Sequence, residues 1–307
     1  MNMSRIKKII KRDWQLYAFI SLPLIYFIVF KYVPMAGLQL AFRRYSARGG
    51  IWHSKWVGLD NVIKFLESYQ FERVVTNTLV LSLYSFFICS IVPIIFALIF
   101  NAIEKPRFKK VTQTIVTLPY FVSVVVLVGI MMQLFNNRVG IYGTLFEMIT
   151  GRYPKDIWSQ PEMFRHMYVL SSVWQTFGWN SIIYIATLSG VDNDLHEAAQ
   201  LDGASRLKRV FYVDLPHIIP TIIILSVMNM GKIMSVGFEK AFLMQNNLNL
   251  EYSELISTYV YNLGLGASYV SDFSLATAVD LFNAVVNLIL IFMANKIATR
   301  ISDTSLW

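Results

Sequence analysis

The chain has 307 residues, of which 55% are apolar and only 15% are charged. Because soluble domains usually carry about 25% charged residues, this composition excludes a soluble enzyme, a disordered protein and a small secreted scaffold. The apolar residues form runs of the length that a helix needs to cross a hydrocarbon core of about 30 Å. We therefore predict an all-α, polytopic membrane protein that is embedded in the lipid bilayer.

Six membrane-spanning helices are predicted in chain order. Their approximate ranges are residues 14–40, 74–100, 111–135, 167–189, 218–243 and 274–295. Residues 1–13 are rich in Lys and Arg and should form a cytoplasmic segment, and residues 14–307 should form one transmembrane domain. The linkers are too long and too polar to be buried, and the outer ones are large enough to receive a binding protein.

The distribution of basic residues predicts the orientation in the membrane. With the N-terminus inside, the inner segments hold 14 Lys and Arg in 63 positions, whereas the outer segments hold 11 in 97. Lys and Arg are enriched on the cytoplasmic side of membrane proteins. Both termini are therefore predicted to be cytoplasmic. The formal net charge of +8 does not indicate nucleic-acid binding, because many basic residues flank the apolar runs.

Residues 190–217, between the fourth and fifth predicted spans, form the most informative segment. Asp194 and Glu197 have the spacing of a capping box, so a short helix is predicted to start at Asp194. Gly203 can adopt a positive φ and end that helix. Pro216 suits the first turn of the next span. The pattern predicts a helix–glycine–helix elbow on the cytoplasmic face.

The same segment resembles the signature loop of permease subunits of ABC importers. That signature is Glu-Ala-Ala, three residues, Gly, nine residues, a β-branched residue, one residue and Leu-Pro. Here its residues are Glu197, Ala198, Ala199, Gly203, Val213, Leu215 and Pro216. Val213 stands where the family more often has Ile.

Further segments make nearly the whole chain similar to the maltose-type carbohydrate importer group, and closest to its branch associated with oligosaccharides such as aldouronates. They are residues 22–34, 56–61, 77–79, 118–119, 178–181, 202–205, 236–239, 258–261 and 306–307. The resemblance implies a permease that moves a carbohydrate by alternating access.

In that family the loop is a coupling helix that docks in a groove on a cytoplasmic ATPase. The resemblance implies that Glu197 makes a polar contact to the ATPase and that Ala198 and Ala199 pack in the groove. Gly203 would form the bend, and the rest of the coupling loop would include Asp202, Leu215 and Pro216. The alternative is that Glu197 only caps its own helix and Gly203 only ends it.

The chain contains no G-x-x-x-x-G-K-[ST] motif, so it cannot bind nucleotide phosphates in a P-loop. It also lacks zinc-ligand spacing and a G-x-S-x-G nucleophile motif. The single cysteine, Cys89, excludes an intramolecular disulfide. We therefore predict no enzyme activity, metal or cofactor in this chain. ATP and Mg²⁺ would be bound by a partner.

The resemblance implies several partners in the cytoplasmic membrane of a prokaryote. They are a second, similar permease, two copies of a cytoplasmic ATPase and an extracytoplasmic solute-binding protein. No nucleic acid is among them. Because polar groups in lipid are costly unless they face a cavity or another helix, those within the spans are candidates for the sugar pathway.

The pathway candidates are Asn77, Trp174, Asn180, Asn229, Lys232, Glu239, Asp280 and Asn283, with Gln133, Trp179, Tyr184 and Asn287 as further members. Each amide could instead form only a bond between helices, and each aromatic could be an anchor at the membrane surface. Two alternatives to an ATP-driven importer also remain: a secondary transporter driven by an ion gradient, and a membrane scaffold that transports nothing.

Overall fold

The fold is that of a computed structural model, which describes residues 12–103, 105–235, 237–266 and 271–301. Nearly all of its elements are helices, and one two-residue antiparallel ladder pairs Arg43–Arg44 with Lys55–Trp56. The predicted all-α class is confirmed. Residues 1–11 of the predicted N-terminal segment, Val236 of the resemblance and the terminal Leu306-Trp307 lie outside the described residues.

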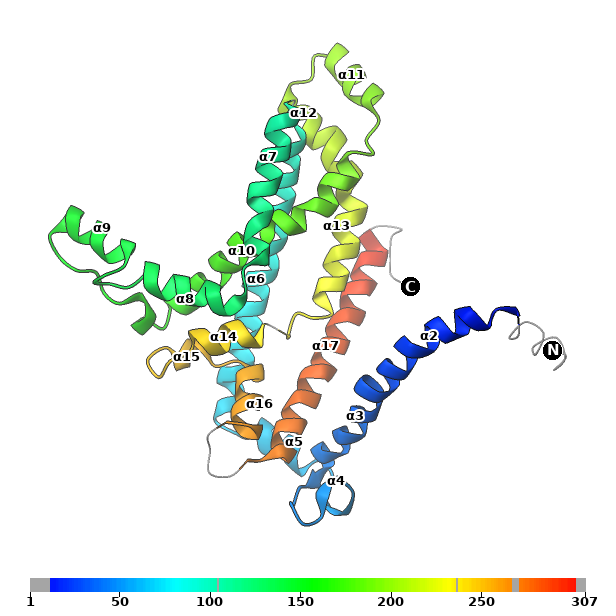
Figure 1. Cartoon of the computed structure of the whole chain (residues 1–307), viewed down its shortest axis with the longest axis vertical. Coiled ribbons are helices and arrows are strands. Elements are labelled where there is room, and N and C mark those ends of the chain that lie inside the picture. The colour runs from blue at the N-terminus through cyan, green and yellow to red at the C-terminus, as the bar shows by residue number, and fades with distance from the viewer. Residues whose placement is uncertain (1–11, 104, 236, 267–270, 302–307) are drawn as a thin grey trace. The chain divides into compact units, whose positions relative to one another are not determined.

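The chain divides into two compact units, of which the first consists of residues 1–68 and 263–281. A single domain over residues 14–307 stays a prediction. The main feature of the first unit is a helical run, seen in blue in Figure 1. It begins with α2 (Trp14–Phe27), none of whose residues is buried. In chain order the elements are α2 (Trp14–Phe27), η1 (Ile28–Tyr32), α3 (Val33–Met35), η2 (Ala36–Phe42), β1 (Arg43–Arg44), α4 (Gly50–His53), β2 (Lys55–Trp56) and α5 (Asp60–Leu66).

The second unit consists of residues 69–262 and 282–307. Its elements begin with α6 (Gln70–Asn101), α7 (Pro106–Thr117), η3 (Leu118–Phe121), α8 (Val124–Leu134), α9 (Ile141–Thr150), η4 (Ile157–Ser159), α10 (Met163–Leu188) and α11 (Asn193–Leu201). They continue with α12 (Arg206–Arg209), η5 (Val210–Asp214), α13 (Leu215–Met230), α14 (Phe238–Met244) and α15 (Leu250–Ser253). α16 (Ile256–Gly264) and α17 (Phe273–Ile301) cross the boundary between the units.

In the second unit α10 packs against α6, α7 and α13 (Figure 1), and the most extensive packing among the described pairs is that of α10 on α6. Buried apolar side chains such as Leu81, Met131 and Val169 form a core there. α10 also crosses α7 closely, because a Cβ at Gly178 would lie 2.0 Å from Val116 O. Glycine permits that approach.

Among the described residues, four helices are long and apolar enough to cross a membrane, or five if one bent pair counts as a span. The four are Trp14–Phe42, Gln70–Asn101, Arg206–Met230 and Phe273–Arg300. The predicted fourth span coincides with α10, which is not in this set, and polar side chains and Arg165 lower its hydropathy. Six spans therefore stay a prediction.

The predicted third span, residues 111–135, is sharply bent in the structure. The segments Pro106–Phe121 and Val124–Leu134 meet at 97°. Pro119 lacks an amide hydrogen and interrupts the helical pattern, and the Ser123 side chain starts α8 by accepting a bond from Val126 N at 3.3 Å. Both residues favour a bend at this point.

The predicted fifth span, residues 218–243, is wrong in its second half. α13 ends at Met230, and a turn precedes α14. The turn is stabilised by α17, because Asn287 Oδ1 accepts a bond from Met234 N at 3.0 Å. The amide freed by the end of the helix is thus satisfied by a neighbouring side chain.

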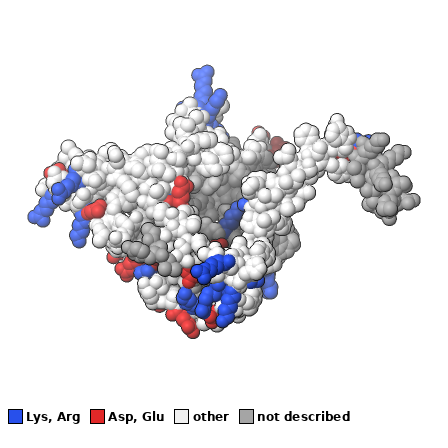
Figure 2. All heavy atoms as spheres, turned by 60° about the horizontal axis from the view of Figure 1, so that its bottom comes forward, with Lys and Arg blue, Asp and Glu red and all other residues white. Residues whose placement is uncertain are grey.

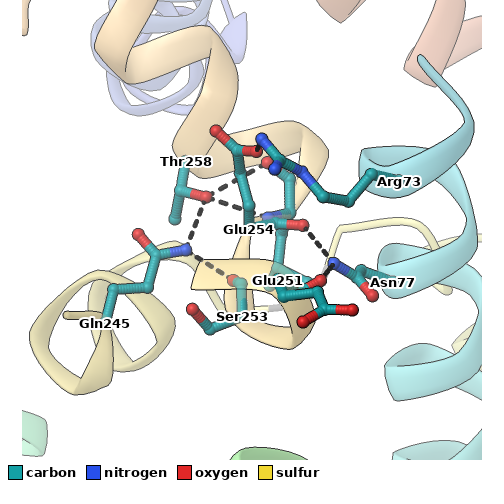
Figure 3. Close-up of polar contacts among 8 residues, drawn as sticks. Arg73, Asn77, Gln245, Glu251, Ser253, Glu254 and Thr258 are labelled. Atoms are coloured by element: carbon teal, nitrogen blue, oxygen red, sulfur yellow. Dashed lines mark hydrogen bonds and ion pairs between the residues drawn. The ribbon is translucent and has the colours of Figure 1, made fainter. Parts of the chain in front are cut away.

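The prediction that the linkers are too polar to be buried is wrong for the segment that follows α14 and includes α15. Glu254 is 7% exposed and forms an ion pair with Arg73 of α6. Asn77 of the same helix donates bonds to the carbonyl oxygens of Glu251, at 2.8 Å, and Glu254, at 3.1 Å (Figure 3). Burial of these polar groups is tolerated because they pair with one another.

The surface of the protein is largely uncharged. Figure 2 shows one face on which Lys, Arg, Asp and Glu gather in a few places and most atoms belong to other residues. The exposed large apolar side chains include Leu22, Phe87, Ile99, Ile115 and Phe292. Apolar surface of this extent needs lipid or protein to cover it.

Candidate functional site

The predicted coupling loop contains a short helix, α11, at one end of the second unit's helices (Figure 1). It spans Asn193–Leu201, and none of its residues is buried. The side chain of Asp192 caps it by accepting a bond from Asp194 N at 3.0 Å. The predicted cap, Asp194, is therefore wrong by two residues, because Asp192 has the extended backbone that a cap requires and the helix starts at Asn193.

Gly203 ends α11 in the way that the sequence predicts. Its φ is +76°. Gly203 N donates to Gln200 O at 3.0 Å, and Ala204 N donates to Ala199 O at 2.9 Å. These two bonds form a Schellman motif, in which a residue with positive φ follows the helix.

The side chains on α11 leave a surface that a partner can contact. Glu197 and Ala198 are exposed, Ala199 is half-buried, and Asp202 directly after the helix is exposed. Glu197 makes no capping bond to its own helix in the described part of the chain, so the capping alternative for this residue is wrong. Docking on an ATPase stays a prediction.

The second half of the elbow leads into the membrane as one helical run from Arg206 to Met230. Ser205 caps it by accepting a bond from Lys208 N at 3.4 Å. Leu215 and Pro216 form the first turn of α13. The predicted place of Pro216 at a helix start is confirmed.

Three predicted pathway residues, Asn180, Asn229 and Lys232, line one hollow of about 310 Å³. The other lining residues are Ser82, Ser85, Phe86, Cys89, Ser90, Tyr168, Ser172, Ile233 and Gly237. These residues come from α6, α10, α13 and the turn after α13. Among the described residues, Lys232 lines the hollow and no carboxylate does.

A second hollow of about 300 Å³ adjoins the first, because Cys89, Ser90, Asn180 and Asn229 line both. Trp179 and Tyr184 also line this second hollow. The indole of Trp179 stacks on Tyr120, with 4.4 Å between ring centroids. Hydroxyls, amides and aromatic faces together suit a ligand that is rich in hydroxyl groups.

The sequence prediction missed two polar groups at this site. Lys240 is 5% exposed, and its Nζ donates to Tyr168 O at 2.9 Å and to Ser172 Oγ at 2.7 Å. Ser82 is 3% exposed, and its Oγ has no partner in the described structure. Serines 82, 85 and 90 interrupt the apolar sequence of α6, and this pattern could have revealed the serine-lined wall. For Lys240 there was no such signal in the sequence, because this residue lies where the predicted fifth span meets a polar linker.

Five predicted pathway residues line neither of these two hollows: Asn77, Trp174, Glu239, Asn283 and Asp280. Asn77 is buried in the cluster of Figure 3, whereas Trp174 and Glu239 are exposed. Asn283 is 8% exposed, and its Oδ1 has no partner among the described residues. Asp280 is exposed on the part of α17 that belongs to the first unit. Within the described residues, no group of three or more His, Cys, Asp or Glu could hold a metal ion.

A known family matches most of this chain. The model of the binding-protein-dependent transport system inner membrane component matches residues 90–303. The chain belongs to this family. It is therefore a transport permease with several membrane-spanning helices.

Two relatives of this permease come from Bacillus subtilis (strain 168). Protein LplB is 38% identical over 298 residues, which cover 97% of this chain and 92% of LplB. The polygalacturonan/rhamnogalacturonan transport system permease protein YteP is 37% identical over 300 residues, which cover 98% of this chain and 92% of YteP.

Solved structures show the same fold at similar identity. A chain of a bacterial ABC transporter involved in the import of the acidic polysaccharide alginate has a TM-score of 0.88 and 37% identity, covering 97% of this permease and 99% of that chain. A chain of a bacterial alginate ABC transporter in complex with an alginate pentasaccharide-bound periplasmic protein has a TM-score of 0.89 and 37% identity, with 98% and 100% covered. The family match favours an ABC import system over the ion-driven transporter and the scaffold.

Proposed function

We propose that this permease is one subunit of an ATP-driven importer that moves an oligosaccharide bearing carboxylate groups across the cytoplasmic membrane. The observation that carries the proposal is the hollow between α6, α10 and α13, which joins hydroxyls and amides to the cation of Lys232. Carboxylates form strong charge-assisted bonds with such a cation. The substrates named for YteP and for the solved importer are polymers with acidic sugars, which supports this class of ligand.

Lys240 adds a buried hydrogen-bond donor beside this site. Its Nζ lies behind the wall of the hollow, bonded to Tyr168 and Ser172, and both of these residues line it. A cation in a site with low dielectric constant acts over several ångströms. Lys232, with no carboxylate among the described lining residues, therefore favours an acidic over a neutral oligosaccharide.

The importer works by alternating access between two permeases. A second, similar permease completes the pathway, two cytoplasmic ATPase subunits bind ATP and Mg²⁺, and an external binding protein delivers the sugar. α11, with Glu197, Ala198 and Ala199, docks on one ATPase. Closure of the ATPase pair moves the elbow inward and opens the hollow to the outside. Hydrolysis then resets the permeases and releases the sugar inside.

The proposal is tested in proteoliposomes that hold both permeases and the ATPase, with the loaded binding protein added. We expect uptake of a labelled oligogalacturonide to require ATP and to continue when ion gradients are abolished. A neutral oligosaccharide of the same length should be imported far less. Uptake that follows an ion gradient without ATP would overturn the proposal.

Lys232→Gln tests the ligand class, because it keeps the size and hydrogen bonding of the side chain but removes its charge. Losing one charge-assisted bond of about 1.5–3 kcal/mol should lower acidic-sugar uptake roughly tenfold or more. Binding-protein stimulation of the ATPase should persist. The matched control is Lys155→Gln, at an exposed position in the segment between α9 and α10, which should import normally. Equal uptake in both variants would remove Lys232 from the pathway.

A further inference from the structure

We propose that Asp214 is a positioning residue that links the coupling helix α11 to the membrane helices α6 and α13. The proposal rests on the importer function above and names the residues that carry movement from the elbow into the membrane. Nothing in the signature loop requires a carboxylate at this position, which precedes Leu215 and Pro216. The link is therefore a property of this chain's own side chains.

Asp214 is the last residue of η5 and is 2% exposed. Its Oδ1 accepts a bond from Asn101 Nδ2, at the end of α6, over 3.2 Å. His196 Nε2 of α11 lies 3.3 Å from the same oxygen. One buried carboxylate oxygen thus joins three separate elements.

The link extends beyond α6 to a fourth element. The carbonyl oxygen of Asn101 accepts a bond from Lys109 Nζ of α7 at 3.1 Å. The same ammonium group lies 5.8 Å from the centre of the Phe100 ring. α11 is therefore connected through polar contacts to η5, which continues into α13, and through Asp214 and Asn101 to α6 and α7.

Apolar packing does not hold α11 in place. None of its residues is buried, and Leu195 and Leu201 are 55% and 90% exposed. A hollow of about 630 Å³ separates it from the ends of α6 and α12, lined among others by His196, Arg209 and Asp214. Where packing is sparse, the specific polar contacts determine the position of a helix.

The backbone on either side of Asp214 favours transmission of movement through this residue. Gly203 turns the chain sharply after α11, and η5 is a π-helical turn that ends two positions before Pro216. π-turns inside helices are often found at functional sites. His196 makes a cross-link between the two arms of the elbow, so that α11 and α13 move together and carry α6 through Asn101.

The test measures the number of ATP molecules hydrolysed per sugar imported by the complete complex in proteoliposomes. His196→Ala and Asp214→Leu each remove the link, and each should raise this ratio about fivefold, a modest value for coupling between two sites. The double variant should raise it no further, because both changes break the same contact. His196→Gln keeps an N–H donor toward Asp214 and should restore most of the coupling.

The matched control is His217→Ala, which removes an exposed histidine near the start of α13. This variant should keep the parental ratio. The proposal is overturned if uptake and hydrolysis fall together at an unchanged ratio, if the effects of the two single changes multiply in the double variant, or if His196→Ala loses the ATPase from the complex. Failure of the parental complex to import sugar with ATP would instead contradict the proposed function.

Discussion

At the scale of single residues, Asn77 and Asn180 are the same residue type in two packed helices, α6 and α10, but their surroundings differ. Asn77 is 3% exposed, and both ends of its amide are used: Arg165 Nη2 donates to its Oδ1 at 2.8 Å, and its Nδ2 donates to Glu251 O at 2.8 Å. Asn180 is exposed and lines both hollows. The first amide stabilises the fold, and the second is available to a ligand.

Asn77→Leu should therefore destabilise the permease without changing its choice of sugar. The variant leaves Arg165 and two carbonyl oxygens with one partner fewer, and each unsatisfied buried group costs about 1–3 kcal/mol. We expect a lower thermal unfolding midpoint in detergent and normal uptake per folded molecule. Asn180→Leu is the matched control and should show normal unfolding with reduced uptake. If Asn77→Leu instead kept a normal unfolding midpoint with reduced uptake, and Asn180→Leu unfolded at a lower temperature with normal uptake, Asn77 would be the residue open to a ligand and Asn180 the one that stabilises the fold.

Gly203 is tested by two substitutions at the same backbone position. A Cβ there would meet no heavy atom within 4 Å, so the cost comes from the φ of +76° alone. Gly203→Ala should cost about 1–2 kcal/mol of elbow stability, whereas Gly203→Asn should cost less because Asn tolerates the left-handed region better. The measurement is ATPase retained on the purified permease. Equal retention in Gly203→Ala and the parent would show that docking does not need this bend.

At the scale of the helices, two π-turns each end two positions before a proline. η1 (Ile28–Tyr32) precedes Pro34, and η5 (Val210–Asp214) precedes Pro216. Proline lacks the amide hydrogen and crowds the carbonyl four residues earlier, so the backbone widens by one residue. Asp214 is the last residue of η5.

Close helix packing gives a prediction at the same scale. Gly178→Ala would place a Cβ 2.0 Å from Val116 O of α7, a clash with backbone that no side-chain movement relieves. The two helices must separate, and we expect little folded permease in membranes. Gly129→Ala on α8 is the control, because its Cβ meets nothing within 4 Å. Normal amounts of the Gly178→Ala variant would mean that the helices cross less closely than described.

At the scale of the whole molecule, the functional surfaces depend on which face of the membrane each segment occupies. The proposed orientation puts α11 in the cytoplasm and the segment between α9 and α10 outside. Lys and Arg near the span ends support this orientation. Both surfaces are exposed, so chemical labelling can reach them from their own side.

Topology is tested with cysteines introduced at two exposed positions. Ser205→Cys should resist an impermeant thiol reagent in whole cells, and Lys155→Cys should react. Cys89, the single native cysteine, is half-buried and serves as the background in the parental chain. After the cells are opened, Ser205→Cys should also react. Labelling of Ser205→Cys in whole cells would reverse the orientation and exclude contact with a cytoplasmic ATPase.

The amino-acid sequence by itself determined the properties that depend on local patterns. Apolar runs predicted the membrane helices, and spacing in residues 190–217 predicted the elbow and the positive φ of Gly203. The same spacing identified the family. These features could be predicted because helix length, turn geometry and the signature each depend on residues that are close together in the sequence.

Tertiary structure alone decided which polar residues share a site. Asn180, Asn229 and Lys232 meet with Ser82 in one hollow, whereas Asn77 is bound into the cluster of Arg73 and Glu254. The same structure bent the third span and joined His196 to Asp214. None of this is visible in sequence spacing, because the helices that carry these side chains are far apart along the chain. Their packing determines which polar groups find partners and which remain open to a ligand.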